Sequence, residues 1–240
     1  MNQKNRIIAA LDVSGREEAL KLVNLLKDEV GVFKIGMQLY NSEGPSIVRE
    51  INAMGGKLFI DLKFHDIPNT VAQASRVMTG ENVYMFNVHA AGGFQMMKAA
   101  GDAARDEAAK RGLEKPKVIA VTVLTSINQE MFNTEIGIDG TISEQVVKWA
   151  KLAQQAGLDG VVASPQEIIP IRQACGEDFL IVTPGVRPSW ADVNDQKRVM
   201  TPKEAVANGA SYLVIGRPIT AQNDPAAAAQ RISAEMNEAD

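Results

Sequence analysis

One short segment of the chain concentrates charge in a way that chemistry could use. It reads Asp61-Leu62-Lys63-Phe64-His65-Asp66-Ile67-Pro68-Asn69-Thr70. The preceding residues, 57–60, predict a buried β-strand, and alternate side chains of a strand share one face, so Asp61 and Lys63 are expected to project together. Burying charges for packing alone would be costly, because each ion gives up its hydration. The segment therefore predicts an acid and a base on one wall of a functional site.

Lys34 extends this pair into a charge-balanced group. It lies within an apolar run, and together with Lys63 it could alternate with the carboxylates of Asp61 and Asp66. At about 4 Å and an effective dielectric constant near 20, each such pair is worth about 4 kcal/mol before desolvation. This pairing would hold Lys63 as an ammonium, which is a poor nucleophile but a good proton donor to a developing carbanion. Such an array requires neither a metal nor an organic cofactor.

Glycine and arginine follow two apolar runs late in the chain. Gly185 and Arg187 follow one run, and Gly216 and Arg217 follow the other. In barrel proteins the corresponding loops commonly bind phosphate, because glycine lets backbone N–H groups approach and arginine makes two hydrogen bonds. A phosphorylated small molecule is implied. The alternative is that these glycines only form turns and that Arg217 is a surface charge.

Three further polar residues lie where such a site could use them. Asp12 follows the first apolar run, and Thr125 follows the fifth. Gln196 lies in residues 189–200, a polar connection long enough to form a lid. Asp12 and Asp66 could instead cap the helices that follow them.

Eight apolar runs alternate with helix-like segments and must position these residues. The predicted strands are Ile7–Val13, Val32–Gly36, Leu58–Leu62, Val83–Val88, Val118–Val123, Gly160–Ala163, Phe179–Val182 and Tyr212–Ile215. The predicted helices are Glu17–Lys27, Pro45–Met54, Val71–Met78, Phe94–Lys110, Glu144–Gln155, Gln166–Gln173, Pro202–Asn208 and Pro225–Met236. Apolar strands between helices indicate a parallel sheet covered on the outside, so we expect one (β/α)8 (TIM) barrel domain over residues 1–240. An open doubly wound sheet is the alternative, but no Gly-x-Gly-x-x-Gly run follows the first strand to support it.

The amino-acid composition is consistent with a barrel protein and limits the classes of partner that the chain could bind. The 240 residues are 45% hydrophobic, which suits one large core. The formal charge of −4, without a long Lys/Arg run, gives little support for nucleic acid or an anionic membrane as a partner. The single cysteine, Cys175, excludes an intrachain disulfide and fits a reducing compartment. Because the sequence shows neither a signal peptide nor a run long enough to span a membrane, we expect a cytoplasmic protein.

The residues above resemble those of the orotidine 5′-phosphate decarboxylase family over nearly the whole chain. The matching motifs are Ala10-Leu11-Asp12, Phe33-Lys34-Ile35-Gly36, Asp61 to Thr70, Leu124-Thr125-Ser126, Asp159 to Ser164, Thr183 to Pro188, Asp195-Gln196 and Ile215-Gly216-Arg217-Pro218. The Asp61 to Thr70 run is the most specific of them. The resemblance implies cofactor-free conversion of orotidine 5′-monophosphate (OMP) to uridine 5′-monophosphate (UMP) and CO2 in pyrimidine synthesis.

The resemblance also implies a role for each site residue. Lys63 would protonate the C6 carbanion left by CO2, and Asp61 would face the substrate carboxylate. Lys34 would contact the carboxylates and the ribose, Asp12 the ribosyl hydroxyls, and Thr125 the pyrimidine. In a homodimer, Asp66, Ile67 and Thr70 would enter the active site of the neighbouring subunit. The closing lid and the phosphate site would be formed with Arg187, Gln196, Gly216 and Arg217. Many relatives carry a glycine soon after the lid's Arg-Pro, where this chain has Ser189-Trp190-Ala191.

Two other functions compete with this interpretation. A metal-dependent sugar-phosphate decarboxylase or aldolase of the same superfamily shares an Asp-x-Lys-x-x-Asp pattern but has an acid in place of Lys34. A divalent cation beside Lys34 would be repelled, which favours the metal-free reaction. A non-catalytic nucleotide-binding barrel would need the phosphate and ribose contacts but no Lys63.

Overall fold

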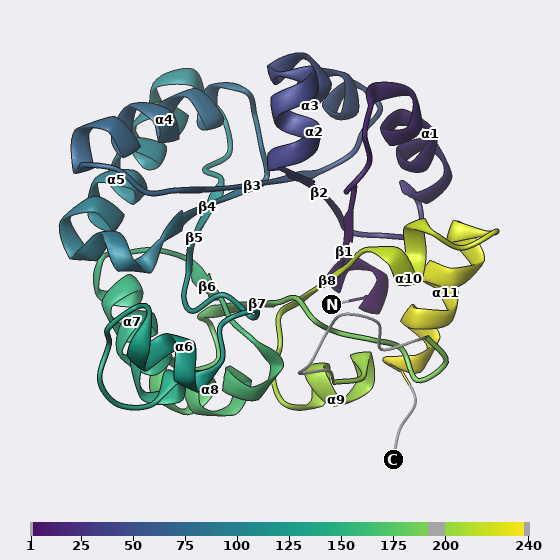
Figure 1. The fold of residues 1–240 in the computed structure, drawn as a ribbon. Coiled ribbons are helices and arrows are strands. Elements are labelled where there is room, and N and C mark those ends of the chain that lie inside the picture. Colours follow the sequence, from purple (N-terminus) through teal and green to yellow (C-terminus); the bar gives the residue numbers. More distant parts are fainter. Residues whose placement is uncertain (1, 192–199, 238–240) are drawn as a thin grey trace.

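Eight parallel strands close into a barrel in the computed structural model, which describes residues 2–191 and 200–237 (Figure 1). The strands are β1 (Ile7–Ala10), β2 (Val32–Gly36), β3 (Leu58–Phe64), β4 (Met85–His89), β5 (Lys117–Val121), β6 (Gly160–Val162), β7 (Leu180–Thr183) and β8 (Tyr212–Ile215). Each strand pairs with the next in sequence, and Ile7 of β1 lies opposite Leu213 of β8, which closes the ring. The predicted (β/α)8 barrel is confirmed.

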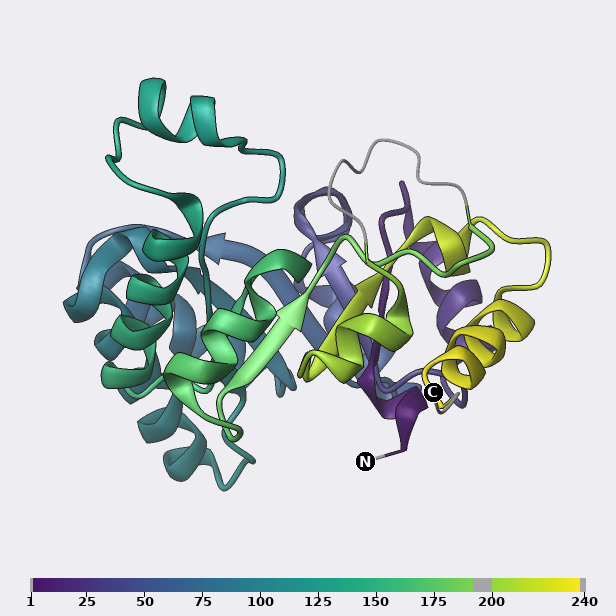
Figure 2. The same cartoon turned by 90° about the horizontal axis from the view of Figure 1, so that it is seen from below.

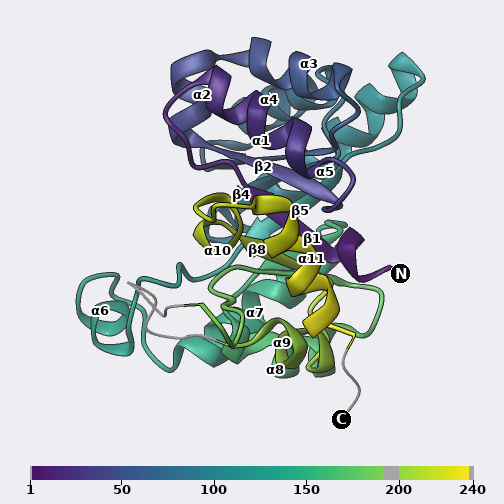
Figure 3. The same ribbon diagram turned by 90° about the vertical axis from the view of Figure 1, so that its right-hand side faces the viewer.

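Helices cover the outside of the barrel in the predicted order. They are α1 (Arg16–Leu26), α3 (Pro45–Ala53), α4 (Pro68–Gly80), α5 (Gly93–Arg111), α7 (Ile142–Gln155), α8 (Ile168–Cys175), α9 (Pro202–Ala207) and α11 (Pro225–Glu235). In α1, Ala19, Leu22, Val23 and Leu26 repeat at helical spacing and are all buried. The last helix, α11, packs beside the N-terminal turn η1 (Gln3–Arg6), which completes the outer layer (Figure 3). No helix in the described part of the chain is long and apolar enough to cross a membrane.

Three short helices were not predicted. They are α2 (Met37–Glu43), α6 (Gln129–Thr134) and α10 (Arg217–Thr220). Helix α6 lies on a segment that projects from the barrel (Figure 2), and the Asn128 side chain caps it by accepting from the N–H of Met131 at 2.9 Å. Each helix spans two turns or fewer, so apolar periodicity could not identify it. Three strands also end earlier than predicted, β1 at Ala10, β5 at Val121 and β6 at Val162, because buried apolar residues continue beyond them into the loops.

Apolar side chains fill the barrel interior. They belong to Ile8, Val32, Phe59, Met85, Ile119, Val182 and Tyr212. A second and larger cluster lies between the strands and the outer helices. Because the interior is packed, a ligand has access only at the ends of the barrel.

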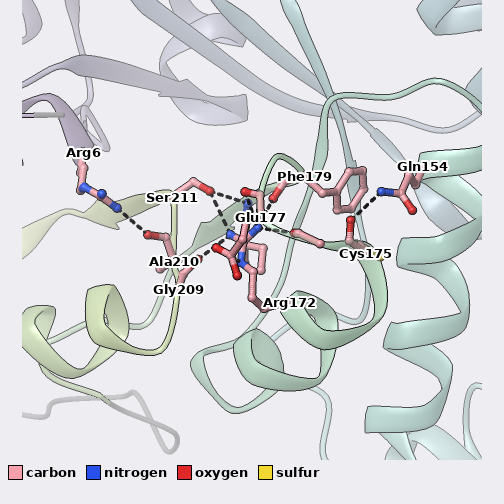
Figure 4. A network of polar contacts seen from close by, with 11 residues as sticks. Arg6, Gln154, Arg172, Cys175, Glu177, Phe179, Gly209, Ala210 and Ser211 are labelled. Carbon is pink, nitrogen blue, oxygen red and sulfur yellow. Dashed lines mark hydrogen bonds and ion pairs between the residues drawn. The ribbon is translucent and has the colours of Figure 1, made fainter.

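One arginine joins several loops at the N-terminal ends of the strands (Figure 4). Nη1 of Arg172 donates to the carbonyls of Gly176, Glu177 and Phe179 at 2.6, 2.8 and 2.9 Å, and Nη2 donates to the carbonyl of Gly209 at 2.6 Å. The guanidinium thereby ties the end of α8 to the start of β7 and to the connection before β8. At this end of a barrel, such a network serves stability rather than catalysis.

Candidate active site

A cavity of about 530 Å³ opens at the C-terminal ends of the strands, a size that suits a small-molecule ligand. The predicted site residues that line it are Asp12, Lys34, Asp61, Lys63, Thr125, Arg187, Gly216 and Arg217. The structure therefore brings together residues from the two ends of the chain. Gln196 lies outside the described residues.

Four charged side chains alternate in sign along one wall of this cavity. Lys34 Nζ lies 3.0 Å from Asp12 Oδ1 and 3.5 Å from Asp61 Oδ2, and Lys63 Nζ lies 2.7 Å from Asp61 Oδ1. The Lys34 side chain is only 9% exposed, whereas that of Asp12 is 61% exposed, so Asp12 is the member of the array that is most open to solvent. Helix α1 begins with Gly15 as its N-cap, so the capping alternative for Asp12 is wrong.

The array keeps the central carboxylate ionised. Burial on its own would raise the pKa of Asp61, because a charged group loses hydration in the interior. The ammonium groups of Lys34 and Lys63, with hydrogen bonds from Lys63 and Asn87, outweigh this effect and lower the pKa below its ordinary value. Asp61 is therefore a fixed negative charge at neutral pH.

The backbone of Lys63 departs from strand geometry. Its φ is +54°, and the pairing of β3 with β4 shifts register between Ile60 and Phe64. The predicted contact between Asp61 and Lys63 is confirmed, but regular strand alternation is the wrong reason for it. A left-handed conformation costs a residue other than glycine about 1–2 kcal/mol. Such strain at a cavity wall is typical of functional sites.

Asn87 of β4 belongs to this site but was not predicted. Its Oδ1 accepts from the backbone N–H of Lys63 at 2.8 Å, and its Nδ2 donates to Asp61 Oδ1 at 2.7 Å. The side chain is fully enclosed, and Asn87 does not line the cavity. The available signal was a single amide within the apolar strand predicted at 83–88.

Asp66, Ile67 and Thr70 lie outside the cavity of their own chain. All three are exposed, and the Asp66 carboxylate accepts from the N–H of Ile67 at 2.7 Å. The expected place of Asp66 in the array within this chain is taken by Asp12. Helix α4 has Ile67 as its N-cap, so Asp66 does not cap it. The contribution of Asp66, Ile67 and Thr70 to the site of a neighbouring subunit stays a prediction.

The glycine and arginine residues lie across the barrel from Lys63. They follow β7 and β8, and β7 is four strands around the ring from β3. Gly185 has a φ of +77°, a left-handed conformation that favours glycine. Arg187 is buried, and its Nη1 donates to the Val186 carbonyl at 3.1 Å, while Arg217 is exposed at the start of α10. Cationic groups thus stand on both sides of the cavity.

A metal site in this cavity would need several ligating side chains close together. Among residues 2–191 and 200–237, no three His, Cys, Asp or Glu side chains gather as metal ligands would. Fold and site together define an enzyme of the (β/α)8 class, with a neutral charged array and an arginine cluster around a single cavity.

The chain belongs to the orotidine 5′-phosphate decarboxylase / HUMPS family, whose model matches residues 5–232. It is 56% identical to the orotidine 5′-phosphate decarboxylase of Syntrophomonas wolfei over 239 residues, which cover 99% of this chain and 100% of that one. It is 54% identical to the protein of the same name from Heliobacterium modesticaldum, with 99% and 98% of the two chains covered. Among solved structures, orotidine 5′-phosphate decarboxylase from Lactobacillus acidophilus superposes with a TM-score of 0.86 at 39% identity, covering 97% of this chain and 99% of that one.

Proposed function

We propose that this chain decarboxylates OMP to UMP and CO2 in pyrimidine biosynthesis, and that Lys63 protonates the C6 carbanion without a cofactor. The general class, a carboxy-lyase, follows from the family. The observation that carries the mechanism is the contact of Lys63 with Asp61 on the cavity wall, within an array that also holds Lys34. It supplies a proton donor and a fixed negative charge side by side.

In the proposed reaction the bond between C6 and the substrate carboxylate breaks. CO2 leaves, and the electron pair stays on C6. The Lys63 ammonium stabilises this charge and gives C6 a proton, after which the lysine amine regains a proton from solvent. The substrate carboxylate beside Asp61 is destabilised by the like charge, and this repulsion disappears as CO2 forms. The array therefore favours the transition state over the bound substrate.

The remaining site residues would bind the rest of OMP. Asp12 and Lys34 would contact the ribose, and Thr125 the pyrimidine. The phosphate would be held by Arg187, Gly216 and Arg217, with Gln196 from the lid. The separation of the arginine residues from Lys63 across the cavity supports this assignment, because it suits a substrate that is anionic at both ends.

A two-fold homodimer would complete the site. Asp66, Ile67 and Thr70 would enter the cavity of the neighbouring subunit. Ile67 supports this proposal, since it is 66% exposed although it is apolar and lies only four residues from Lys63. We place the enzyme in the cytoplasm, with no nucleic-acid or membrane partner, on the basis of its net charge of −4 and its single, buried cysteine, Cys175.

The test is the loss of absorbance as OMP becomes UMP, measured before and after treatment with EDTA. We expect turnover that EDTA does not change. Activity that requires a restored divalent cation would favour the metal-dependent sugar-phosphate alternative, although Lys34 at the centre of the array opposes a cation there. Binding of UMP without turnover of OMP would favour the non-catalytic barrel.

A further inference from the structure

We propose that Asn87 is a positioning residue, which holds the Lys63 backbone and the Asp61 carboxylate in the geometry that decarboxylation needs. The catalytic part of this inference rests on the function proposed above. Asn87 does not line the cavity, so it would act only through these two residues.

The two hydrogen bonds of Asn87 reach both members of the catalytic pair. Oδ1 accepts from the Lys63 backbone N–H at 2.8 Å, and Nδ2 donates to Asp61 Oδ1 at 2.7 Å. This orientation of the amide is the only one possible, because an N–H can only donate and a carboxylate can only accept. The same Asp61 oxygen receives Lys63 Nζ at 2.7 Å. A single side chain therefore links the backbone of one partner to the charged group of the other.

Asn87 lies where the β3–β4 ladder is interrupted. Regular pairing holds at Ile60 with Phe86 and resumes at Phe64 with Val88. Between these points β4 advances by two residues and β3 by four, so β3 carries an irregularity opposite Asn87. The amide supplies a hydrogen bond that the regular ladder cannot provide there, and thereby supports the left-handed backbone of Lys63.

An amide suits this position because it donates to Asp61 without carrying charge. Asp61 already faces two ammonium groups, Lys34 from β2 and Lys63 from β3, and lies within electrostatic reach of His89 on β4. A third cation would upset the balance of the array, whereas an apolar side chain would remove the acceptor of the Lys63 N–H and leave Asp61 Oδ1 with Lys63 Nζ as its hydrogen-bond donor.

Two variants separate positioning from general support of the fold. Asn87→Asp keeps the shape and the acceptor for the Lys63 N–H but places a second carboxylate against Asp61. Asn87→Leu removes both hydrogen bonds at similar volume. The matched control is Thr122→Val, which removes another buried side-chain hydrogen bond, from Thr122 Oγ1 to the Val162 carbonyl at 2.8 Å. If Asn87→Leu does not fold, the isosteric aspartate variant still decides the question.

Turnover and ligand binding should respond differently in the Asn87 variants. We expect kcat per folded molecule to fall about 100-fold in each, the size expected for displacement of a reacting group by about 1 Å. The dissociation constant for UMP should stay within about threefold, because UMP has no carboxylate to face Asp61 and its phosphate contacts lie across the cavity from Lys63. Thr122→Val should keep the wild-type kcat. Wild-type kcat in Asn87→Asp, or loss of UMP binding in proportion to kcat, would overturn the proposal.

A measurement independent of turnover separates this inference from the proposed function. The Asp61 carboxyl can be titrated by carbon NMR in the wild type and in the Asn87 variants. Loss of the amide donor should move its pKa upward, because that hydrogen bond stabilises the charged form. An unchanged Asp61 titration rejects the positioning role. If the wild type fails to decarboxylate OMP, the proposed function fails, and the titration alone then decides whether Asn87 positions Asp61.

Discussion

Replacement of Lys63 should abolish turnover while leaving the fold intact. In Lys63→Ala the ammonium that faces Asp61 at 2.7 Å is lost, but Asp61 keeps Lys34 at 3.5 Å and Asn87 at 2.7 Å. An ammonium about 4 Å from a developing carbanion, at an effective dielectric constant near 20, is worth about 4 kcal/mol. This corresponds to a fall of about 1,000-fold in kcat. The loss of proton donation adds to it.

The stability of Lys63 variants should also follow an unusual order. Lys63 has a φ of +54°, so alanine inherits the left-handed strain while glycine relieves it. We expect Lys63→Gly to be more stable than Lys63→Ala by about 1 kcal/mol, although glycine normally weakens a strand. Both variants should be equally inactive.

Two measurements on the purified variants check this reasoning. The absorbance change of OMP reports kcat, and urea unfolding reports the free energy of unfolding. A folded Lys63→Ala enzyme that keeps a tenth or more of the wild-type kcat would refute the catalytic assignment. A glycine variant less stable than the alanine variant would show that the Lys63 backbone is not strained.

Four further predictions follow from other parts of the structure. Arg217→Ala should lower turnover of OMP far more than turnover of the phosphate-free nucleoside, since remote binding energy serves closure of the site; equal losses would remove the phosphate assignment. Lys63→Ala and Asp66→Asn homodimers should each be nearly inactive, but unfolding and refolding them together should restore about a quarter of wild-type activity, because half the dimers then carry one intact site. No recovery would mean that Asp66 serves its own chain. Arg172→Met should destabilise the fold by about 2–4 kcal/mol in urea unfolding without changing kcat per folded molecule, because its carbonyl partners lie at the end of the barrel away from the cavity. Because the pKa of Asp61 is lowered by folding, its ionised form stabilises the native state fully above the unfolded pKa of about 4, and this contribution is lost as pH falls through the lower, folded pKa. The difference in unfolding free energy between wild type and Asp61→Asn should therefore shrink in acid, and a constant difference would contradict the pairing.

The order of strands and helices could be predicted because it depends on local patterns. Each apolar run is long enough to form one buried strand, and each helical segment repeats its apolar residues at a recognisable spacing. The ends of elements were predicted less well. Leu11 and Val13 are buried apolar residues at strand spacing and favour a longer strand, yet β1 ends at Ala10. Composition alone does not mark where strand pairing stops.

The residues of the site were predictable because they interrupt apolar runs. Lys34, Asp61 and Lys63 stand within or directly after strands, where charge is costly unless it is paired. Parallel strands bring their C-terminal ends to one face, so these residues had to lie near one another. Residue type and position along the chain were enough to predict that these three side chains lie in one site.

Only the tertiary structure decided which charges pair and how the pair is held. Within one chain, Asp12 extends the array, because β1 pairs with β2 and places Asp12 3.0 Å from Lys34, whereas Asp66 is exposed outside the cavity of its own chain. The left-handed backbone of Lys63 and its support by Asn87 depend on the register of β3 against β4, 24 residues apart in sequence. Contacts between neighbouring strands of the closed barrel decide which charges pair and which backbone conformation Lys63 adopts. These contacts outweigh the local preference of β3 for regular strand geometry.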